Sequence, residues 1–133
     1  MRVLIVGDAP EADAVEERLR ASQVAVERRG DDPPPGDGSQ EIAEIARGLR
    51  EFEALLRGSE ANGVLVASDS PAALAALLVA TKVATPVALL EPPGDPADDG
   101  ANARLIRRLA DTTLARDPAA VVDWVRAGYP ARE

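Results

Sequence analysis

The chain has 133 residues and a formal net charge of −8, and it contains neither cysteine nor histidine. Disulfides, thiolate chemistry, zinc sites of the Cys/His type and imidazole acid–base catalysis are therefore excluded. The negative charge argues against nucleic acid or an anionic membrane as the main partner, because both attract basic surfaces. We expect one domain over residues 1–133 with an aliphatic core, since 46% of the residues are hydrophobic and only 2% are aromatic.

Short apolar runs alternate with helical stripes along the chain. Strands are predicted at residues 2–6, 24–27, 63–67, 86–90 and 112–115. Helices are predicted at residues 10–21, 39–57, 71–82, 101–110 and 118–127. The inward-facing side chains should include Ile42 in the second helix and Leu105, Ile106 and Leu109 in the fourth. This alternation predicts an α/β fold, a Rossmann-like or flavodoxin-like three-layer α/β/α sandwich with five parallel strands in the order 2-1-3-4-5.

Two helix starts are candidate anion sites. Asp8 precedes the first helix with Glu11 three residues later, as in a capping box, and Pro10 lies in the first turn. Ser70 is the expected N-cap of the third helix, with Pro71 at its first position. The free N–H groups of the first turns that begin at Asp8 to Pro10 and at Ser70 could bind a phosphate. Both turns are acidic and lack a neighbouring basic residue, so self-capping is the simpler interpretation.

Two carboxylates are expected at the ends of neighbouring strands. Asp69 follows the third strand and Glu91 the fourth, and the carboxyl ends of parallel strands are where open α/β sheets bind ligands. Such a pair could serve as acid and base in a proton transfer. The alternative is that Asp69 only caps the following helix and Glu91 is solvated.

Charged residues in and after the loop at 92–100 also allow two interpretations. Asp95, Asp98 and Asp99 could bind Ca²⁺ or Mg²⁺, but acids in a Pro/Gly loop without an EF-hand pattern are usually solvated. The arginines of the fourth helix could contact an anion, or they could form the solvent-exposed face of that helix. We expect no metal and no cofactor.

Four motifs in order resemble one family. They are Gly7-Asp8-Ala9-Pro10-Glu11-Ala12, Leu65-Val66-Ala67-Ser68-Asp69-Ser70, Pro86-Val87-Ala88-Leu89-Leu90-Glu91, and Gly100-Ala101-Asn102 with the later Leu109-Ala110-Asp111. They resemble motifs in the N-terminal domain of the non-hydrolysing UDP-N-acetylglucosamine 2-epimerases, which have two Rossmann-like domains. The resemblance implies that Asp69 and Glu91 are the catalytic candidates, and it adds Asn102 to Asp8, Pro10 and Ser70 as a ligand-binding candidate.

The departures from the family pattern imply lost activity. Ala9 stands where the family has an arginine that holds the nucleotide sugar, Gly100 replaces a catalytic glutamate, and Ala103 replaces an arginine. We therefore expect a catalytically degenerate domain that acts in self-association or an accessory interaction, with weak nucleotide-sugar binding at most. The alternative is half of a split epimerase, which needs a partner chain for its second domain. A third class is a flavodoxin-like small-molecule or response domain.

The resemblance also implies a homodimer, because the family pairs through this domain. We expect a cytoplasmic bacterial protein, since the chain opens with a strand at residues 2–6 and not with a signal peptide. The helices at 40–57 and 71–82 carry more apolar and alanine surface than one sheet face needs, so we expect them to form the interface, with Phe52 and Leu77 as markers. No apolar run approaches the ~20 residues that cross a bilayer, and no membrane partner is expected.

Overall fold

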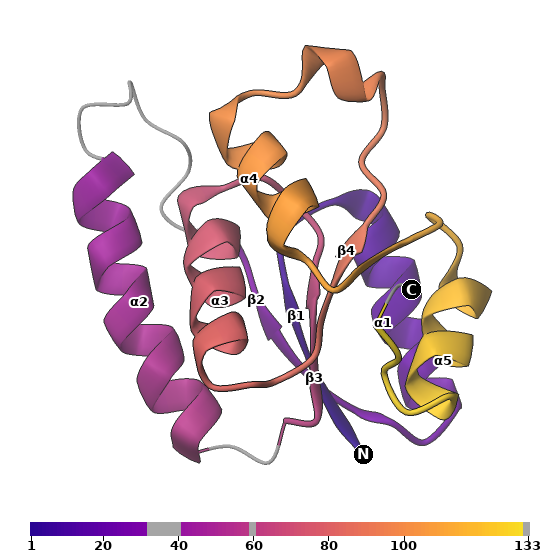
Figure 1. Ribbon diagram of the computed structural model, residues 1–133. Coiled ribbons are helices and arrows are strands. Elements are labelled where there is room, and N and C mark those ends of the chain that lie inside the picture. Colours follow the sequence, from indigo (N-terminus) through magenta and orange to yellow (C-terminus); the bar gives the residue numbers. More distant parts are fainter. Residues whose placement is uncertain (32–40, 59–60, 132–133) are drawn as a thin grey trace.

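A computed structural model describes residues 1–31, 41–58 and 61–131. At its centre is a parallel sheet in the order β2-β1-β3-β4-β5, with helices on both faces (Figure 1). The strands are β1 (Arg2–Val6), β2 (Ala25–Arg29), β3 (Gly63–Val66), β4 (Val87–Leu90) and β5 (Thr112–Leu114). The helices are α1 (Pro10–Ala21), α2 (Glu41–Gly58), α3 (Pro71–Lys82), α4 (Ala101–Leu109) and α5 (Pro118–Arg126), with a 3-10 helix η1 (Pro96–Asp98). The predicted fold class and strand order are confirmed.

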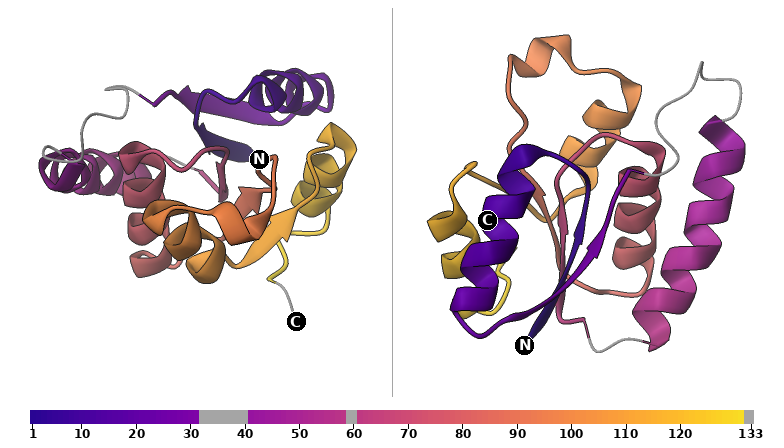
Figure 2. Two further views of the ribbon diagram at one scale, coloured as in Figure 1. Left: turned by 90° about the horizontal axis from the view of Figure 1, so that it is seen from above. Right: turned by 180° about the vertical axis from the view of Figure 1, so that it is seen from behind.

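The helices form two layers (Figure 2). One core lies between the sheet and α3 and α4, with α2 packed on the outer side of α3. The other core lies between the sheet and the pair α1 and α5. The middle strands β1, β3 and β4 are almost wholly apolar, because both of their faces are covered. The edge strands β2 and β5 are only partly buried, as edge positions require.

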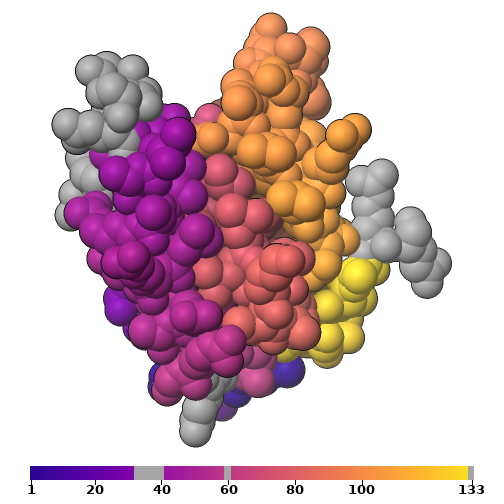
Figure 3. Space-filling model, turned by 60° about the vertical axis from the view of Figure 1, so that its left-hand side comes forward, coloured from indigo at the N-terminus to yellow at the C-terminus, as the bar shows by residue number. Residues whose placement is uncertain are grey.

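Helix α3 is the most deeply buried helix among those described. It packs against the sheet on one side and is flanked by α2 and α4, so that only a strip of it reaches the surface (Figure 3). Its alanines allow a close approach of α2, since a Cβ at Gly48 would lie 2.8 Å from the Cβ of Ala75. Leu77 is fully buried and Phe52 is 5% exposed. Both expected interface markers therefore belong to the core.

All five strands end at the same edge of the sheet because all are parallel. Val6 pairs with Arg29 and Val66, and Val66 pairs with Leu89, so the segments that follow these strands converge. Gly7 makes the convergence possible. It has a φ of +133°, and a Cβ there would lie 2.8 Å from the carbonyl carbon of Ala67.

Two local predictions at the first helix and second strand are wrong. The N-cap of α1 is Ala9, which forms no side-chain cap bond, and Asp8 does not cap the helix because its carboxylate binds elsewhere. Strand β2 runs from Ala25 to Arg29 and not from 24 to 27. Arg28 can lie in a strand because its guanidinium donates to the Gly7 carbonyl oxygen at 2.8 Å and pairs with carboxylates of α1.

The expected inward faces of α2 and α4 are also partly wrong. Ile106 is buried against the core, but Leu105 is 47% exposed and Leu109 is 39% exposed. Helix α4 has nine residues and packs on α3 through one narrow side, so it buries only one of its three large apolar side chains. Ile42, in the first turn of α2, is 81% exposed. The predicted start of this helix at residue 39 lies outside the described residues.

A search of the described helices for a membrane span finds none that combines the required length with the required hydropathy.

Candidate functional site

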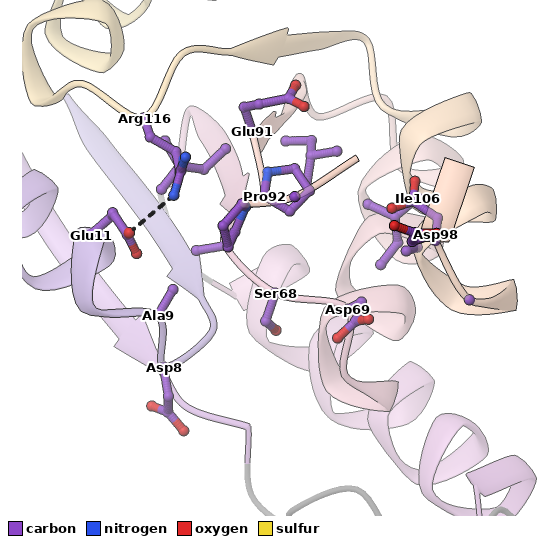
Figure 4. Close-up of a pocket in the computed structure, with 18 of the residues that line it drawn as sticks. Asp8, Ala9, Glu11, Ser68, Asp69, Glu91, Pro92, Asp98, Ile106 and Arg116 are labelled. Atoms are coloured by element: carbon purple, nitrogen blue, oxygen red, sulfur yellow. Dashed lines mark hydrogen bonds and ion pairs between the residues drawn. The ribbon is translucent and has the colours of Figure 1, made fainter. Parts of the chain in front are cut away.

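A pocket of about 580 Å³ lies at the carboxyl edge of the sheet (Figure 4). Residues from the segments after all five strands line it, together with the loop around η1. Leu89, Leu90 and Ile106 give it an apolar part. Its volume is in the range of small-molecule sites, and its position is the one at which open α/β sheets bind their ligands.

The lining of this pocket is strongly acidic. Among the described residues that line it, the carboxylates are Asp8, Glu11, Asp31, Asp69, Glu91, Asp95, Asp98 and Asp99. The positively charged lining residue is Arg116. A pocket with this balance repels a phosphate group, and it favours a neutral or cationic group.

Asp8 and Asp31 form a reciprocal pair after β1 and β2. The Asp31 N–H donates to Asp8 Oδ2 at 2.8 Å, and the Asp8 N–H donates to Asp31 Oδ2 at 3.1 Å. The Ser68 hydroxyl donates to Asp31 Oδ1 at 2.7 Å, and its oxygen lies 3.1 Å from Ser70 Oγ. This network joins the ends of three strands, so Asp8 stabilises the edge of the sheet and leaves the first turn of α1 uncapped by a side chain.

Glu91 is bound by an arginine of α4. Arg107 donates from Nη1 to Glu91 Oε1 at 3.0 Å and from Nε to Asp99 Oδ2 at 2.9 Å. These hydrogen bonds, first the one to Asp99 and then the one to Glu91, raise the pKa of the Arg107 guanidinium above its ordinary value. Arg107 therefore connects the end of β4 to the far side of the loop at 92–100, and Glu91 is neither free nor simply solvated.

Asp69 differs from Glu91 because its carboxylate forms no hydrogen bond or ion pair with the residues that the structure describes. Its backbone oxygen accepts a hydrogen bond from Asn102 Nδ2 at 3.4 Å. Ser70 caps α3, as predicted, by accepting from the Ala73 N–H at 3.1 Å. Asp69 is thus not the helix cap, and of the two catalytic candidates it is the one available to a ligand.

On the opposite side of the pocket, Glu11 and Arg116 form an ion pair at 3.4 Å (Figure 4). The pair joins the first turn of α1 to the segment after β5. Arg116 is therefore partly neutralised and offers little free positive charge to an anion.

The structure brings the sequence-derived candidates together in two groups. Asp8, Asp69 and Glu91 line the main pocket. Asp69 also lines an adjoining hollow of about 400 Å³, together with Ser70 and Asn102. Pro10 begins α1 and lines neither of these cavities. Within the described ranges, no group of three or more His, Cys, Asp or Glu side chains is placed to hold a metal ion.

Two participants, Asp31 and Arg116, are missed by the sequence pattern, and Arg107, expected to contact an external anion or solvent, instead binds two carboxylates of the chain. Asp31 could have been found from its place two residues after β2, at the same edge as Asp8. Arg107 lies eight residues after Asp99, two helical turns along α4, which is compatible with a contact back to the loop. No comparable signal marks Arg116, because its partner is 105 residues away in the chain.

The chain matches no known family model, and no curated protein is significantly similar to it in sequence. Its fold is similar to that of several solved structures. One is the UDP-GlcNAc 2-epimerase of Methanocaldococcus jannaschii, with a TM-score of 0.70 and 21% identity over 96% of this chain and 43% of that one. For the Neisseria meningitidis UDP-GlcNAc 2-epimerase bound to UDP-GlcNAc, the TM-score is 0.68 and the identity 19%, over 98% of this chain and 44% of that one. For the S. aureus MnaA–UDP structure, the TM-score is 0.67 and the identity 17%, over 96% of this chain and 41% of that one.

These comparisons confirm, at the level of the fold, the resemblance that the motif order indicates. The chain spans less than half the length of the epimerases that it matches. At these identities the likeness concerns the fold, and the chemistry has to be argued from the pocket itself.

Proposed function

We propose that this chain is an epimerase-like domain without epimerase chemistry of its own, which acts through binding and association. The observation that carries the proposal is the state of the carboxylate pair. Proton transfer at a sugar carbon needs an acid and a base that are both free to reach the substrate. The Asp69 carboxylate has no partner among the described residues, but Glu91 is held by Arg107, which also binds Asp99.

The negative charge of the pocket should make its binding of a nucleotide sugar weak. The neighbouring structures from Neisseria meningitidis and S. aureus are described as bound to UDP-GlcNAc and UDP. Here Ala9 lines the pocket where the family motif has an arginine, and Arg116 is paired with Glu11. A diphosphate therefore meets many carboxylates and little free positive charge, while a sugar ring finds apolar walls and acceptor oxygens.

Incorporation of deuterium at the second carbon of the sugar tests the loss of chemistry. We expect the isolated chain, incubated with UDP-GlcNAc in deuterated water and followed by NMR, to give no more exchange than a sample without protein. Exchange above that control that disappears in Asp69→Asn would overturn the proposal. Exchange that persists in Asp69→Asn would point to a contaminating epimerase.

Self-association is the second part of the proposal, and the outer face of α2 is the surface that supports it best. Ile42 is 81% exposed in the first turn of this helix, and exposed charges of both signs, including Arg47 and Glu51, lie along its outer side. A face of mixed charge can meet its own copy across a two-fold axis without net repulsion. We expect sedimentation to show a dimer that Ile42→Glu dissociates. A monomer at all concentrations and salt levels would contradict this part.

A split enzyme is the second candidate function. It is favoured by the carboxylate of Asp69, which no described residue binds, and by the match to only 41–44% of the length of the neighbours quoted above. In that case a partner chain would supply the remaining domain and would bind Arg107 in place of Glu91. The Glu91 carboxylate would then be released to act on the substrate. Mixing with such a chain would then produce the isotope exchange that the isolated protein lacks, and Glu91→Gln would abolish it.

A further inference from the structure

The outer face of α4 is a separate surface that the pocket does not use. Its exposed residues are Ala101, Arg104, Leu105, Arg108 and Leu109. Their spacings of three and four place them on one side of the helix, opposite the buried Ile106. A shallow hollow of about 690 Å³ runs beside this face, and Pro96 of η1 borders it.

The apolar content of this face is unusual for the molecule. Of the four large hydrophobic side chains that are exposed in the described residues, Leu105 and Leu109 are two. They lie one turn apart, so they form one apolar ridge along α4. Contiguous exposed apolar surface of this kind marks interaction sites more often than scattered single residues do.

The charge of this face is opposite to that of the rest of the chain. Helix α4 contains three arginines and no acidic residue, in a protein with a net charge of −8. Arg107 is engaged by Glu91 and Asp99, and Arg104 donates to the Asp99 backbone oxygen at 3.1 Å. Arg108 forms no hydrogen bond or ion pair with a described residue. Two exposed positive charges therefore flank the two leucines.

The acidic groups nearest to this face in the chain do not cancel these charges. Asp99 borders the hollow but is bound by Arg107. Asp111, just after the helix, accepts from the Val87 N–H at 2.9 Å on the sheet side. The neighbouring helix α3 has no acidic residue, and its only charged residue is Lys82.

We infer that the outer face of α4 docks an acidic amphipathic helix of a partner protein. Leucines on such a helix would cover Leu105 and Leu109, and glutamates or aspartates beside them would pair with Arg104 and Arg108. The contact is short, because the nine residues of α4 extend over about 13 Å, so roughly three turns of partner helix cover it. Two exposed ion pairs and a small apolar ridge give a weak, salt-sensitive complex.

A second copy of this chain fits the face less well. A two-fold dimer would place this surface against itself, and Arg104 and Arg108 would face their own copies. Neither α4 nor α3 offers a carboxylate to such a partner. The mixed-charge face of α2 is therefore the better surface for self-association.

Fluorescence anisotropy with labelled helical peptides tests the inference on the whole chain. The probe is a peptide of about 18 residues with leucines at i, i+4 spacing flanked by glutamates. Two control peptides have every glutamate replaced by lysine or every leucine by serine. We expect saturable binding of the first peptide, at least about tenfold weaker binding of both controls, and weakening in 0.5 M salt.

Variants of the chain locate the binding. Arg104→Glu with Arg108→Glu, and separately Leu105→Ser with Leu109→Ser, should each weaken the acidic peptide about tenfold while circular dichroism stays unchanged. Arg18→Glu with Arg126→Glu, on the exposed sides of α1 and α5, is the matched control and should have no such effect. Absence of binding, equal binding of the lysine peptide, or loss only in this control would overturn the inference. So would a dimer that Leu105→Ser with Leu109→Ser dissociates, because a second copy would then cover this face.

Discussion

The two edges of the sheet are built in opposite ways. At the amino edge, Gly63 begins β3 against the ring of Tyr129. The rings of Tyr129 and Trp124 form a T-shaped pair with their centroids 5.0 Å apart. At the carboxyl edge, the segments after the strands meet around the acidic pocket and leave it open to solvent. The amino edge is closed by aromatic packing, and the carboxyl edge is held open by polar networks.

This difference identifies the edge that can bind a ligand. Tyr129 and Trp124 fill the space at the amino edge, and Trp124 Nε1 donates to the Pro130 carbonyl oxygen at 3.2 Å. At the carboxyl edge the Asp8–Asp31 pair and the Arg107 bridge fix the walls of the pocket in place. Stability should therefore depend most on the amino edge, and ligand binding should depend on the carboxyl edge.

The largest effect should come from filling the amino edge. A Cβ at Gly63 would lie 2.5 Å from Tyr129 Cδ1, so Gly63→Val must displace the ring and its packing against Trp124. We expect a loss of about 2 kcal/mol in the free energy of unfolding. Gly58→Ala is the control, because a Cβ there meets no atom within 4 Å, and it should stabilise slightly. Equal urea midpoints for the Gly63 variant and the wild type would show that this edge is not tightly packed.

A smaller loss is expected from breaking the bridge at the carboxyl edge. Arg107→Met leaves Glu91 and Asp99 without their shared partner, and the side chain of Asp99 is only 12% exposed. The unfolding free energy should fall by about 1 kcal/mol, and hydrogen exchange at the amides of Asp98 and Asp99 should become faster. Arg108→Met, one residue away and without a described partner, should change neither quantity. If both variants behave alike, the bridge does not hold the loop.

The smallest effect at neutral pH should come from Tyr129→Phe. The Tyr129 hydroxyl is buried without a hydrogen-bond partner among the described residues, so its removal should leave the unfolding free energy within about 0.5 kcal/mol of the wild type.

Burial raises the pKa of this phenol above its ordinary value of about 10. The folded chain then holds the proton more tightly than the unfolded chain does. This stabilisation is complete below about pH 10 and is lost as the pH rises through the folded pKa.

Urea unfolding at pH 7 and at successively higher pH compares the two proteins. Tyr129→Phe should lose less stability than the wild type above pH 10. Absorbance at 295 nm reports the titration directly, because Tyr129 is the only tyrosine. A titration at the ordinary pKa of a free phenol would contradict the burial of this hydroxyl.

The sequence predicted the fold well because the fold depends on local patterns. Val64–Val66 and Val87–Leu90 are continuous apolar runs, and Ser70–Pro71 and Asp117–Pro118 are helix starts that the structure retains. The inward face of α4 was mispredicted for a physical reason. Periodicity shows which residues share a side of a helix, but it does not show how wide a contact the neighbouring helix offers.

The candidate site was only partly predictable, since its chemistry depends on contacts between distant segments. The positions of Asp69 and Glu91 at the same edge follow from the parallel strands. The binding of Glu91 by Arg107 and the pairing of Asp8 with Asp31 depend on the paths of two loops, which local propensity does not determine. These contacts are what distinguish a free carboxylate from an engaged one.

The most direct test of the difference between the edges is a ¹H–¹⁵N NMR titration of the whole chain with UDP-GlcNAc. We expect amide shifts at Gly7, Asp8, Asp69 and Glu91, with a dissociation constant in the millimolar range, and no shift at Gly63 or Tyr129. Because the pocket is acidic, 0.5 M salt should not weaken this binding. Shifts concentrated at Gly63 and Tyr129, or no shift at the carboxyl edge at any concentration, would contradict the assignment of the pocket as the binding site.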